Sequence, residues 1–216
     1  MKDRFDLLVF DWDGTLINSI QWIVECIQKS ALACGCAVPS EAAARSVIGL
    51  SLDRAMAELF PGVTGPTAGR LVEAYRSFYF ARAVGEDDLF TGIRAMLEAL
   101  RGTGYQLAVA TGKNRAGLSR ALDATATRSL FHAFRSAEET ASKPNPEMLL
   151  QIMAELNVRR ERTLMIGDSV HDLRMALNAG TDAVAVACGA NTQEELEALG
   201  PLACLGHTAE LLALLV

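Results

Sequence analysis

The 216-residue sequence has no basic cluster and no long apolar run, and each absence excludes a class of protein. The formal net charge is −6, and a nucleic-acid partner is not expected because phosphate contacts need concentrated positive charge. No apolar run approaches the roughly 20 residues of a membrane helix, and the N-terminus lacks a signal-peptide pattern. We therefore expect no membrane partner and a cytoplasmic location.

Cysteines are few and do not form a recognisable framework. Cys34 and Cys36 are separated by one residue, and no histidine lies nearby to complete a zinc site. Half of the residues are hydrophobic, so a full core can form without disulfides or a structural metal. We expect all five thiols to be reduced and structurally inert.

The region after the first apolar run carries helical patterns only. Apolar residues recur at helical spacing over 19–37, and Ser40 is placed to cap a second helix. Two more helices are expected over 51–60 and 67–83, separated by the Pro- and Gly-containing stretch PGVTGP. These segments predict an all-helical block of roughly 65 residues.

From Gly92 onward, helical segments alternate with short, apolar, β-branched runs. The expected strands are QLAVAT at 106–111, TLMIG at 163–167 and DAVAVA at 182–187. Such alternation predicts a parallel sheet covered by helices on both faces, and the apolar run before Asp11 is expected to join it. The predicted class is α/β: a three-layer, Rossmann-like core with a mainly parallel sheet (1–16 and 86–216) and an inserted all-helical cap domain (17–85).

Polar residues follow the expected strands at the edge where ligands bind in open parallel sheets. Asp11 ends the first strand, Thr111 the second and Asp168 a third, while Lys143 precedes a helix. The question is whether the DWD sequence at 11–13 is an acidic turn or part of a chemical site. Four polar or charged groups from distant parts of the chain favour the site.

The carboxylates in this group predict a cation site. Asp11, Asp168 and Asp172 would repel one another without a cation, and a cluster of oxygen ligands suits Mg²⁺. Asp168 and Asp172 are four residues apart, so a helix beginning near Ser169 directs both to one side. The alternative for Asp172 is a purely structural role, as an acidic residue near a helix N-terminus, where the helix dipole favours negative charge.

The remaining groups suit a phosphoryl substrate. Thr111 offers a hydroxyl and the following amide, and Lys143 offers a full positive charge, as phosphoryl transfer requires. Asp11 can serve as a nucleophile that forms an aspartyl-phosphate. The DGT turn returns Asp13 toward the same place, where it can act as acid and base.

Four segments together resemble, in order, the motifs of the haloacid dehalogenase-like hydrolase superfamily. They are DWDGTL at 11–16, AVATGK at 108–113, SKPNPEML at 142–149 and GDSVHD at 167–172. The resemblance covers essentially the whole chain, including the cap, and is nearest to the phosphoglycolate phosphatase-like branch. It implies a Mg²⁺-dependent phosphatase that acts on a small phosphate monoester, phosphoglycolate or a related metabolite, as a monomer or homodimer.

The resemblance also implies roles for individual residues. The implied catalytic residues are Asp11, Asp13, Thr111 and Lys143. The implied metal ligands are Asp11, Asp168, Asp172 and the backbone carbonyl of Asp13. The implied phosphate-binding residues are Thr111, Gly112 and Lys143.

Several alternatives remain open at this point. Arg54 follows a cap loop that in this family closes over the substrate, so it is a candidate for an anionic substrate group or an ordinary helix residue. Lys113 is a candidate substrate contact or a solvated lysine, and His171 is expected at the surface. A sugar phosphomutase shares these motifs, and a non-catalytic binding protein on the same fold is a third possibility.

Overall fold

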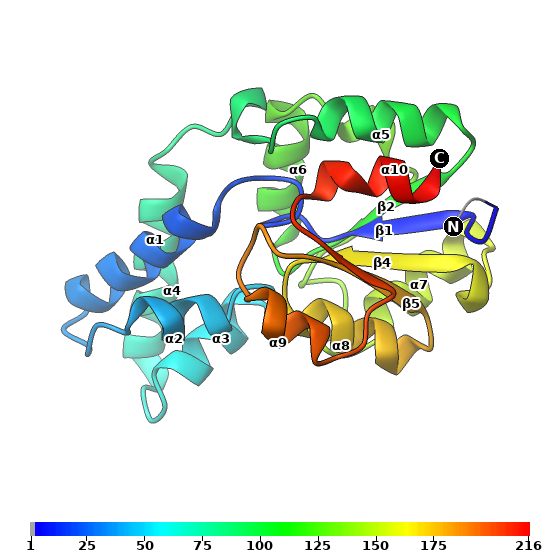
Figure 1. Cartoon of the computed structure of the whole chain (residues 1–216). Helices are drawn as coiled ribbons and strands as arrows, with labels where there is room; N and C mark the ends of the chain where they lie inside the picture. Colours follow the sequence, from blue (N-terminus) through cyan, green and yellow to red (C-terminus); the bar gives the residue numbers. More distant parts are fainter. Residues whose placement is uncertain (1–2) are drawn as a thin grey trace.

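The computed structural model describes residues 3–216, which form a six-stranded parallel sheet with helices on both faces and a separate block of helices (Figure 1). The strand order is β3-β2-β1-β4-β5-β6, and every neighbouring pair is parallel. Their bounds are β1 Leu7–Phe10, β2 Gln106–Ala110, β3 Ala133–Arg135, β4 Thr163–Gly167, β5 Asp182–Val186 and β6 Ala203–Leu205. The predicted fold class is confirmed.

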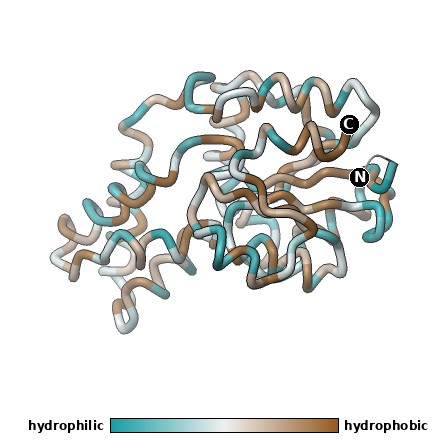
Figure 2. The backbone as a smooth tube through the Cα atoms, in the orientation of Figure 1, coloured by the Kyte–Doolittle hydropathy of each residue, from teal (hydrophilic) through white to brown (hydrophobic). Residues whose placement is uncertain are grey.

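Alternate strand residues face two different layers of helices. One face packs against α5 (Ile93–Gly102), α6 (Arg115–Ala124) and α10 (Leu211–Leu215). The other packs against α7 (Glu147–Leu156) and α8 (Val170–Ala179), while α9 (Gln193–Glu197) lies beside β5 and β6. β1 and β4 are buried along their whole lengths, and their residues are apolar except for Thr163 and Gly167 at the two ends of β4; the hydropathy colouring in Figure 2 shows these central strands as largely hydrophobic.

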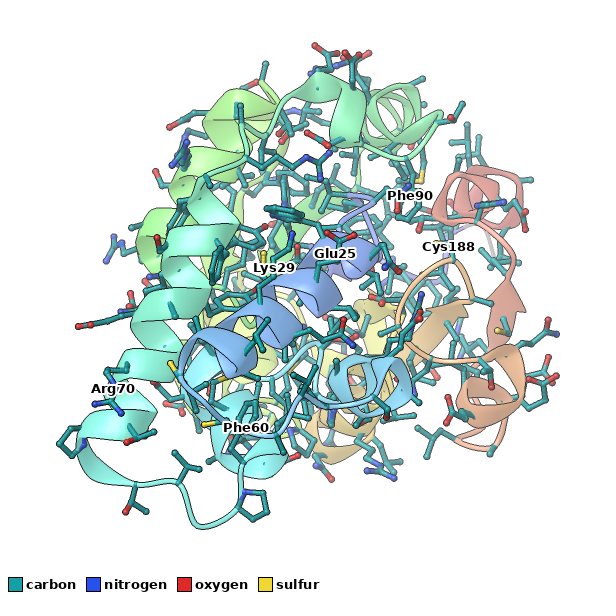
Figure 3. The ribbon with its side chains drawn as sticks, turned by 90° about the vertical axis from the view of Figure 1, so that its left-hand side faces the viewer. Glu25, Lys29, Phe60, Arg70, Phe90 and Cys188 are labelled. Atoms are coloured by element: carbon teal, nitrogen blue, oxygen red, sulfur yellow. The ribbon has the colours of Figure 1, made fainter. Side chains whose placement is uncertain are left out.

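The helical block has an apolar core of its own. It consists of α1 (Ile20–Ala33), α2 (Glu41–Ser46), α3 (Leu52–Leu59) and α4 (Gly65–Phe80). Ile23, Ile27 and Leu71 belong to this core. On the outer surface of α1, seen in Figure 3, Glu25 and Lys29 form an ion pair of 3.2 Å. We refer to this block as the cap.

The cap helices differ from the sequence-based expectation mainly at their ends. The Ser40 side chain accepts a hydrogen bond from Ala43 N, which confirms it as an N-cap. The first helix ends at Ala33 instead of continuing to 37, because Gly35 takes a left-handed conformation (φ 69°). The fourth covers 65–80 instead of 67–83.

The chain leaves and re-enters the sheet region along two adjacent segments. Ile17 forms a bridge with Leu89, Asn18 N donates to Asp88 O at 2.8 Å, and Phe90 N donates to Leu16 O at 3.0 Å. Both connections to the cap therefore run side by side. The exact domain boundaries at 17 and 85 stay a prediction.

Two features of the described chain bear on the expectations from composition. All five cysteines are free thiols. Among residues 3–216, no helix combines the length and the apolar character needed to cross a membrane.

Candidate active site

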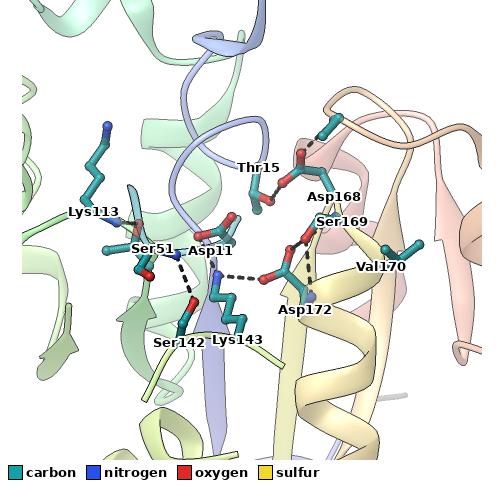
Figure 4. A network of polar contacts seen from close by, with 12 residues as sticks. Asp11, Thr15, Ser51, Lys113, Ser142, Lys143, Asp168, Ser169, Val170 and Asp172 are labelled. Atoms are coloured by element: carbon teal, nitrogen blue, oxygen red, sulfur yellow. Dashed lines mark hydrogen bonds and ion pairs between the residues drawn. The ribbon is translucent and has the colours of Figure 1, made fainter. Parts of the chain in front are cut away.

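The carboxyl ends of β1 and β4 bring together four buried charged residues (Figure 4). Asp11 follows β1, and Asp168 follows β4. Asp172 lies in the first turn of α8, and Lys143 lies in the loop before α7. Parallel strands end at one edge of the sheet, which is why residues so distant in sequence meet here.

Lys143 is the cation at the centre of this cluster. Its Nζ lies 2.8 Å from Asp11 Oδ1 and 2.7 Å from Asp172 Oδ1, and the contact with Asp11 is an ion pair without the directed geometry of a hydrogen bond. Burial alone would lower the pKa of Lys143, but the charges of Asp11 and Asp172 outweigh it and hold that pKa above its ordinary value. Lys143 therefore remains charged at neutral pH.

Asp168 is held rigidly by groups from two other segments of the chain. Its carboxylate accepts hydrogen bonds from Thr15 Oγ1 at 2.7 Å and from Ala190 N at 2.8 Å. A Cβ atom at Gly189 would lie 2.0 Å from Asp168 Oδ2, so only glycine allows this close approach. Burial and the nearby charge of Asp172 raise the pKa of Asp168 to about 7.

The cluster fits a hard divalent cation. Carboxylate oxygens of Asp11, Asp168 and Asp172 lie within 4.8 Å of one another, and Lys143 is the cation paired with two of them. Burial, followed by the charges of Asp172 and Asp168, raises the pKa of Asp11 well above its usual range, although the charge of Lys143 opposes that shift. An all-oxygen donor set with an excess of buried negative charge is the chemistry that Mg²⁺ and similar ions prefer.

The carboxylate of Asp13 points elsewhere. It accepts a hydrogen bond from Ser19 Oγ at 2.6 Å and lies 2.8 Å from Lys113 Nζ. Gly14, with φ 78°, makes the tight turn that follows it, and a side chain there would collide with Asp168. Asp13 thus stands beside the cluster, and both of its carboxylate oxygens are held by neighbouring side chains.

Lys113 is the residue whose position the sequence left most open. It is largely buried, and its Nζ donates to the Tyr79 hydroxyl at 2.7 Å besides pairing with Asp13. Burial lowers the pKa of Lys113, but the negative charge of Asp13 more than reverses that effect. Of the two alternatives that the sequence left open, the solvated lysine is contradicted, because Lys113 is paired with Asp13 and with Tyr79 of the cap, 34 residues earlier in the chain.

Thr111 and Gly112 lie at the end of β2, next to the cap. Thr111 is buried, and its Oγ1 accepts a hydrogen bond from Lys113 N at 3.2 Å. A Cβ atom at Gly112 would lie 2.3 Å from Leu50 O, so the cap backbone approaches this loop too closely for any other residue. The absence of a side chain at 112 thus sets how closely the cap sits.

The cap loop at 47–51 contacts other loops of the cluster as well. Ser51 N donates to Ser142 Oγ at 2.9 Å, next to Lys143. His171 Nε2 lies 2.9 Å from Ser46 O at the end of α2. His171 is therefore a partly exposed residue at the contact between α8 and the cap, and it is not among the described residues that could hold a metal ion.

A cavity of about 140 Å³ lies between the cap and the sheet. Asp11, Asp13 and the loop at 111–114 line it on the sheet side. Apolar side chains of α1 and the 47–52 loop, together with the aromatic side chains of α4, form the opposite wall. The arrangement places the carboxylates of Asp11 and Asp13 and the ammonium of Lys113 around one partly open space between the sheet and the cap.

Arg54 does not take part in this site. It is exposed on α3, where its Nε donates to Glu58 Oε1 at 3.1 Å, and it is not among the described residues that line the cavity. The reason is helical phase: Ser51, Leu52 and Asp53 face the cavity, and the next residue turns outward. The predicted contact between Arg54 and the substrate therefore has no support in this structure.

Comparisons with known proteins agree with this arrangement. The family model described as haloacid dehalogenase-like hydrolase matches residues 8–186. The chain is 33% identical to the probable phosphatase IndB of Dickeya dadantii, over 90% of this chain and 86% of that protein. It is 32% identical to the tyrosine-protein kinase PtkA of Mycobacterium tuberculosis, over 85% of this chain but only 62% of that protein.

Solved structures show the same fold over the same length. A predicted phosphoglycolate phosphatase from Haemophilus somnus superposes with a TM-score of 0.86 at 23% identity, covering 98% of both chains. At this identity the likeness concerns the fold alone.

Proposed function

Since this chain belongs to the haloacid dehalogenase-like hydrolases and is a phosphoric monoester hydrolase, we propose that it cleaves a small phosphorylated metabolite with Mg²⁺ through an aspartyl-phosphate on Asp11. The observation that carries this proposal is the position of Asp11. It is buried at the end of β1, lines the cavity and lies 2.8 Å from Lys143. The oxygen cluster with Asp168 and Asp172 adjoins it.

The first half-reaction is transfer of the phosphoryl group to the carboxylate of Asp11. An Asp11 oxygen bonds to phosphorus as the bond from phosphorus to the leaving oxygen breaks, and protonated Asp13 gives that oxygen its proton. Lys143 and the amides of the Thr111–Gly112 loop would stabilise the phosphoryl charge. A divalent cation, when bound by Asp11, Asp168, Asp172 and the Asp13 carbonyl, supplies further charge neutralisation.

The second half-reaction releases phosphate. Asp13, now ionised, accepts a proton from water as the water oxygen bonds to phosphorus and the bond to Asp11 breaks. Asp13 thereby regains the proton it gave away, and Asp11 returns as a free carboxylate. The Ser19 hydroxyl and Lys113 hold the Asp13 side chain in the orientation needed for both steps.

Phosphate release by an Asp11→Asn variant tests the nucleophile. With Mg²⁺ and a panel of phosphorylated metabolites, we expect the variant to lose at least about 10³-fold in kcat, because an amide is a poor nucleophile toward phosphorus. Asp87→Asn, at an exposed position, is the control and should retain full activity. Normal turnover by Asp11→Asn would refute the assignment.

The same panel separates the two competing functions. With a hexose 1-phosphate and a bisphosphate activator, free phosphate supports a hydrolase, whereas an isomerised sugar phosphate indicates a phosphomutase. Failure to turn over any ester in the presence of Mg²⁺ would instead indicate a binding protein on the same fold.

A further inference from the structure

Most of the cavity wall that the cap contributes is apolar, which favours an uncharged leaving group. Ile23 and Ile27 of α1, Val47 and Ile48 of the cap loop, and Tyr75 of α4 line this side. Ile23, Ile27, Val47 and Ile48 are buried. A leaving alcohol in this space would exchange water for aliphatic and aromatic contacts, which favours apolar groups by roughly 25 cal/mol per Å² of apolar surface removed from water.

The charges that face the cavity also disfavour an anionic leaving group. Among the described lining residues are four carboxylates, Asp11, Asp13, Asp53 and Glu138, against two cations, Lys113 and Arg76. Lys113 already forms an ion pair with Asp13 at 2.8 Å and a hydrogen bond to Tyr79, so its charge is compensated within the protein. Arg76 also lines the cavity, but it is an exposed residue, so water screens its charge. A buried carboxylate on the leaving group would therefore lack a dedicated partner, which is costly in free energy.

One neutral polar group remains available. Within residues 3–216 the Tyr75 hydroxyl makes no hydrogen bond, and its ring stacks on that of Tyr79 with centroids 5.7 Å apart. The stack holds Tyr75 in place, so its hydroxyl can meet a hydroxyl or carbonyl of a substrate at small entropic cost. The cavity of about 140 Å³ is partly open to solvent, so the leaving alcohol can enter from outside.

We propose that the substrate is a phosphate monoester whose leaving alcohol is uncharged and largely apolar. This inference rests on the proposed phosphatase function and narrows its substrate class. Esters whose leaving group carries a carboxylate or a second phosphate are therefore not expected to be preferred substrates.

Two isosteric esters test this inference. Isopentyl phosphate and the phosphate ester of β-hydroxypropanoate differ only in an isopropyl group against a carboxylate of similar shape. With Mg²⁺ present, we expect kcat/KM to be at least about tenfold higher for isopentyl phosphate, because the carboxylate would be buried without a partner. p-Nitrophenyl phosphate, whose leaving group needs little protonation, reports whether the enzyme is active at all.

Adding a cation to the cavity should reverse part of this preference. Leu52→Lys places an ammonium at a half-buried lining position and should shift the ratio of the two kcat/KM values at least about fivefold toward the carboxylate ester. Ala57→Lys adds the same charge to the exposed side of α3, away from this cavity, and should leave the ratio unchanged.

The possible results distinguish failure of the substrate inference from failure of the proposed phosphatase function. Equal kcat/KM values, a preference for the carboxylate ester, or turnover of p-nitrophenyl phosphate alone would overturn the inference and leave the phosphatase proposal standing. A carboxylate preference that disappears in Arg76→Ala would identify Arg76 as an anion receptor. No hydrolysis of any of the three esters would overturn the proposed function itself.

Discussion

At the scale of single residues, the site is defined by how buried charges are compensated. Lys143 is fully buried and stands between Asp11 and Asp172, so each carboxylate retains an ion-pair partner inside the protein. Breaking a buried ion pair leaves an uncompensated charge, which is far more costly than losing an exposed pair. This lysine therefore stabilises the fold, and in the proposed function it also supplies the positive charge that faces the phosphate.

Lys143→Ala should affect both properties at once. We expect kcat to fall by about 10²–10³-fold, because a positive group facing the phosphoryl oxygens is lost. The free energy of unfolding should also fall by about 3–5 kcal/mol, since Asp11 and Asp172 lose their cation. Phosphate release and denaturant titration measure the two effects.

Lys29→Ala provides the matched control. Lys29 belongs to an exposed ion pair with Glu25, so its loss should change the free energy of unfolding by no more than about 0.5 kcal/mol and leave kcat intact. Equal effects of the two substitutions would show that Lys143 has no special role.

At the scale of elements, the contact between cap loop and sheet loops is set by glycine. Leu50 O would lie 2.3 Å from a Cβ atom at Gly112, and Ser51 N donates to Ser142 Oγ at 2.9 Å. The 47–51 loop thus sits directly on the loops that carry Thr111 and Lys143. Small clashes at such a contact change how completely the cavity closes.

Gly112→Ala should push the cap loop outward. Gly112 does not adopt a positive φ, so alanine brings no strain at its own backbone, but its Cβ would collide with the backbone carbonyls of Leu50 and Gly49, so we expect the protein to fold with a lower Tm. We expect kcat/KM for a small ester to fall at least about tenfold, because a displaced loop leaves the site open to water. Steady-state kinetics and thermal unfolding measure the two quantities.

Gly102→Ala is the control for this substitution, because nothing lies within 4 Å of a Cβ atom at that position. It should leave kcat/KM unchanged. Unaltered kinetics in Gly112→Ala would mean that the loop does not need this close approach.

The sequence predicts the long, buried elements of the fold but not the short ones. β1, β2 and β4 were predicted because buried parallel strands are continuous apolar runs, and this placed Asp11 and Asp168 at one edge. The short edge strand β6 and helices α9 and α10 were not predicted, since three to five residues give too little periodicity. Lys113 was left open because its partners, Asp13 and Tyr79, come from other segments of the chain.

At the scale of the whole molecule, buried acids link folding to pH and to metal binding. Burial and Asp172 raise the pKa of Asp168 to about 7 in the folded protein, against roughly 4 in an unfolded chain. Between these values the folded state binds more protons than the unfolded state, so stability decreases as the pH rises. Above pH 7 the full cost of the buried charge is present.

The metal-free protein should therefore unfold at a lower temperature at pH 8 than at pH 6. Saturating Mg²⁺ should raise Tm at pH 8 more than at pH 6, because a bound cation favours ionised carboxylates. Thermal unfolding in EDTA and in Mg²⁺ at both pH values gives the comparison. If Mg²⁺ raised Tm equally at both pH values, the cation would not be bound by the carboxylates whose pKa values are raised.

The central claim is that Asp11 carries the phosphoryl group, and a direct measurement is mass spectrometry of the acid-quenched enzyme. Asp13→Asn removes the proposed base for the second half-reaction, so after mixing with Mg²⁺ and an ester that needs no protonation, such as p-nitrophenyl phosphate, one phosphoryl group per chain should accumulate. The account predicts this group on the peptide that contains Asp11, and its absence from Asp11→Asn with Asp13→Asn combined. A phosphoryl group on another residue, or continued turnover without any phosphorylated enzyme, would contradict it.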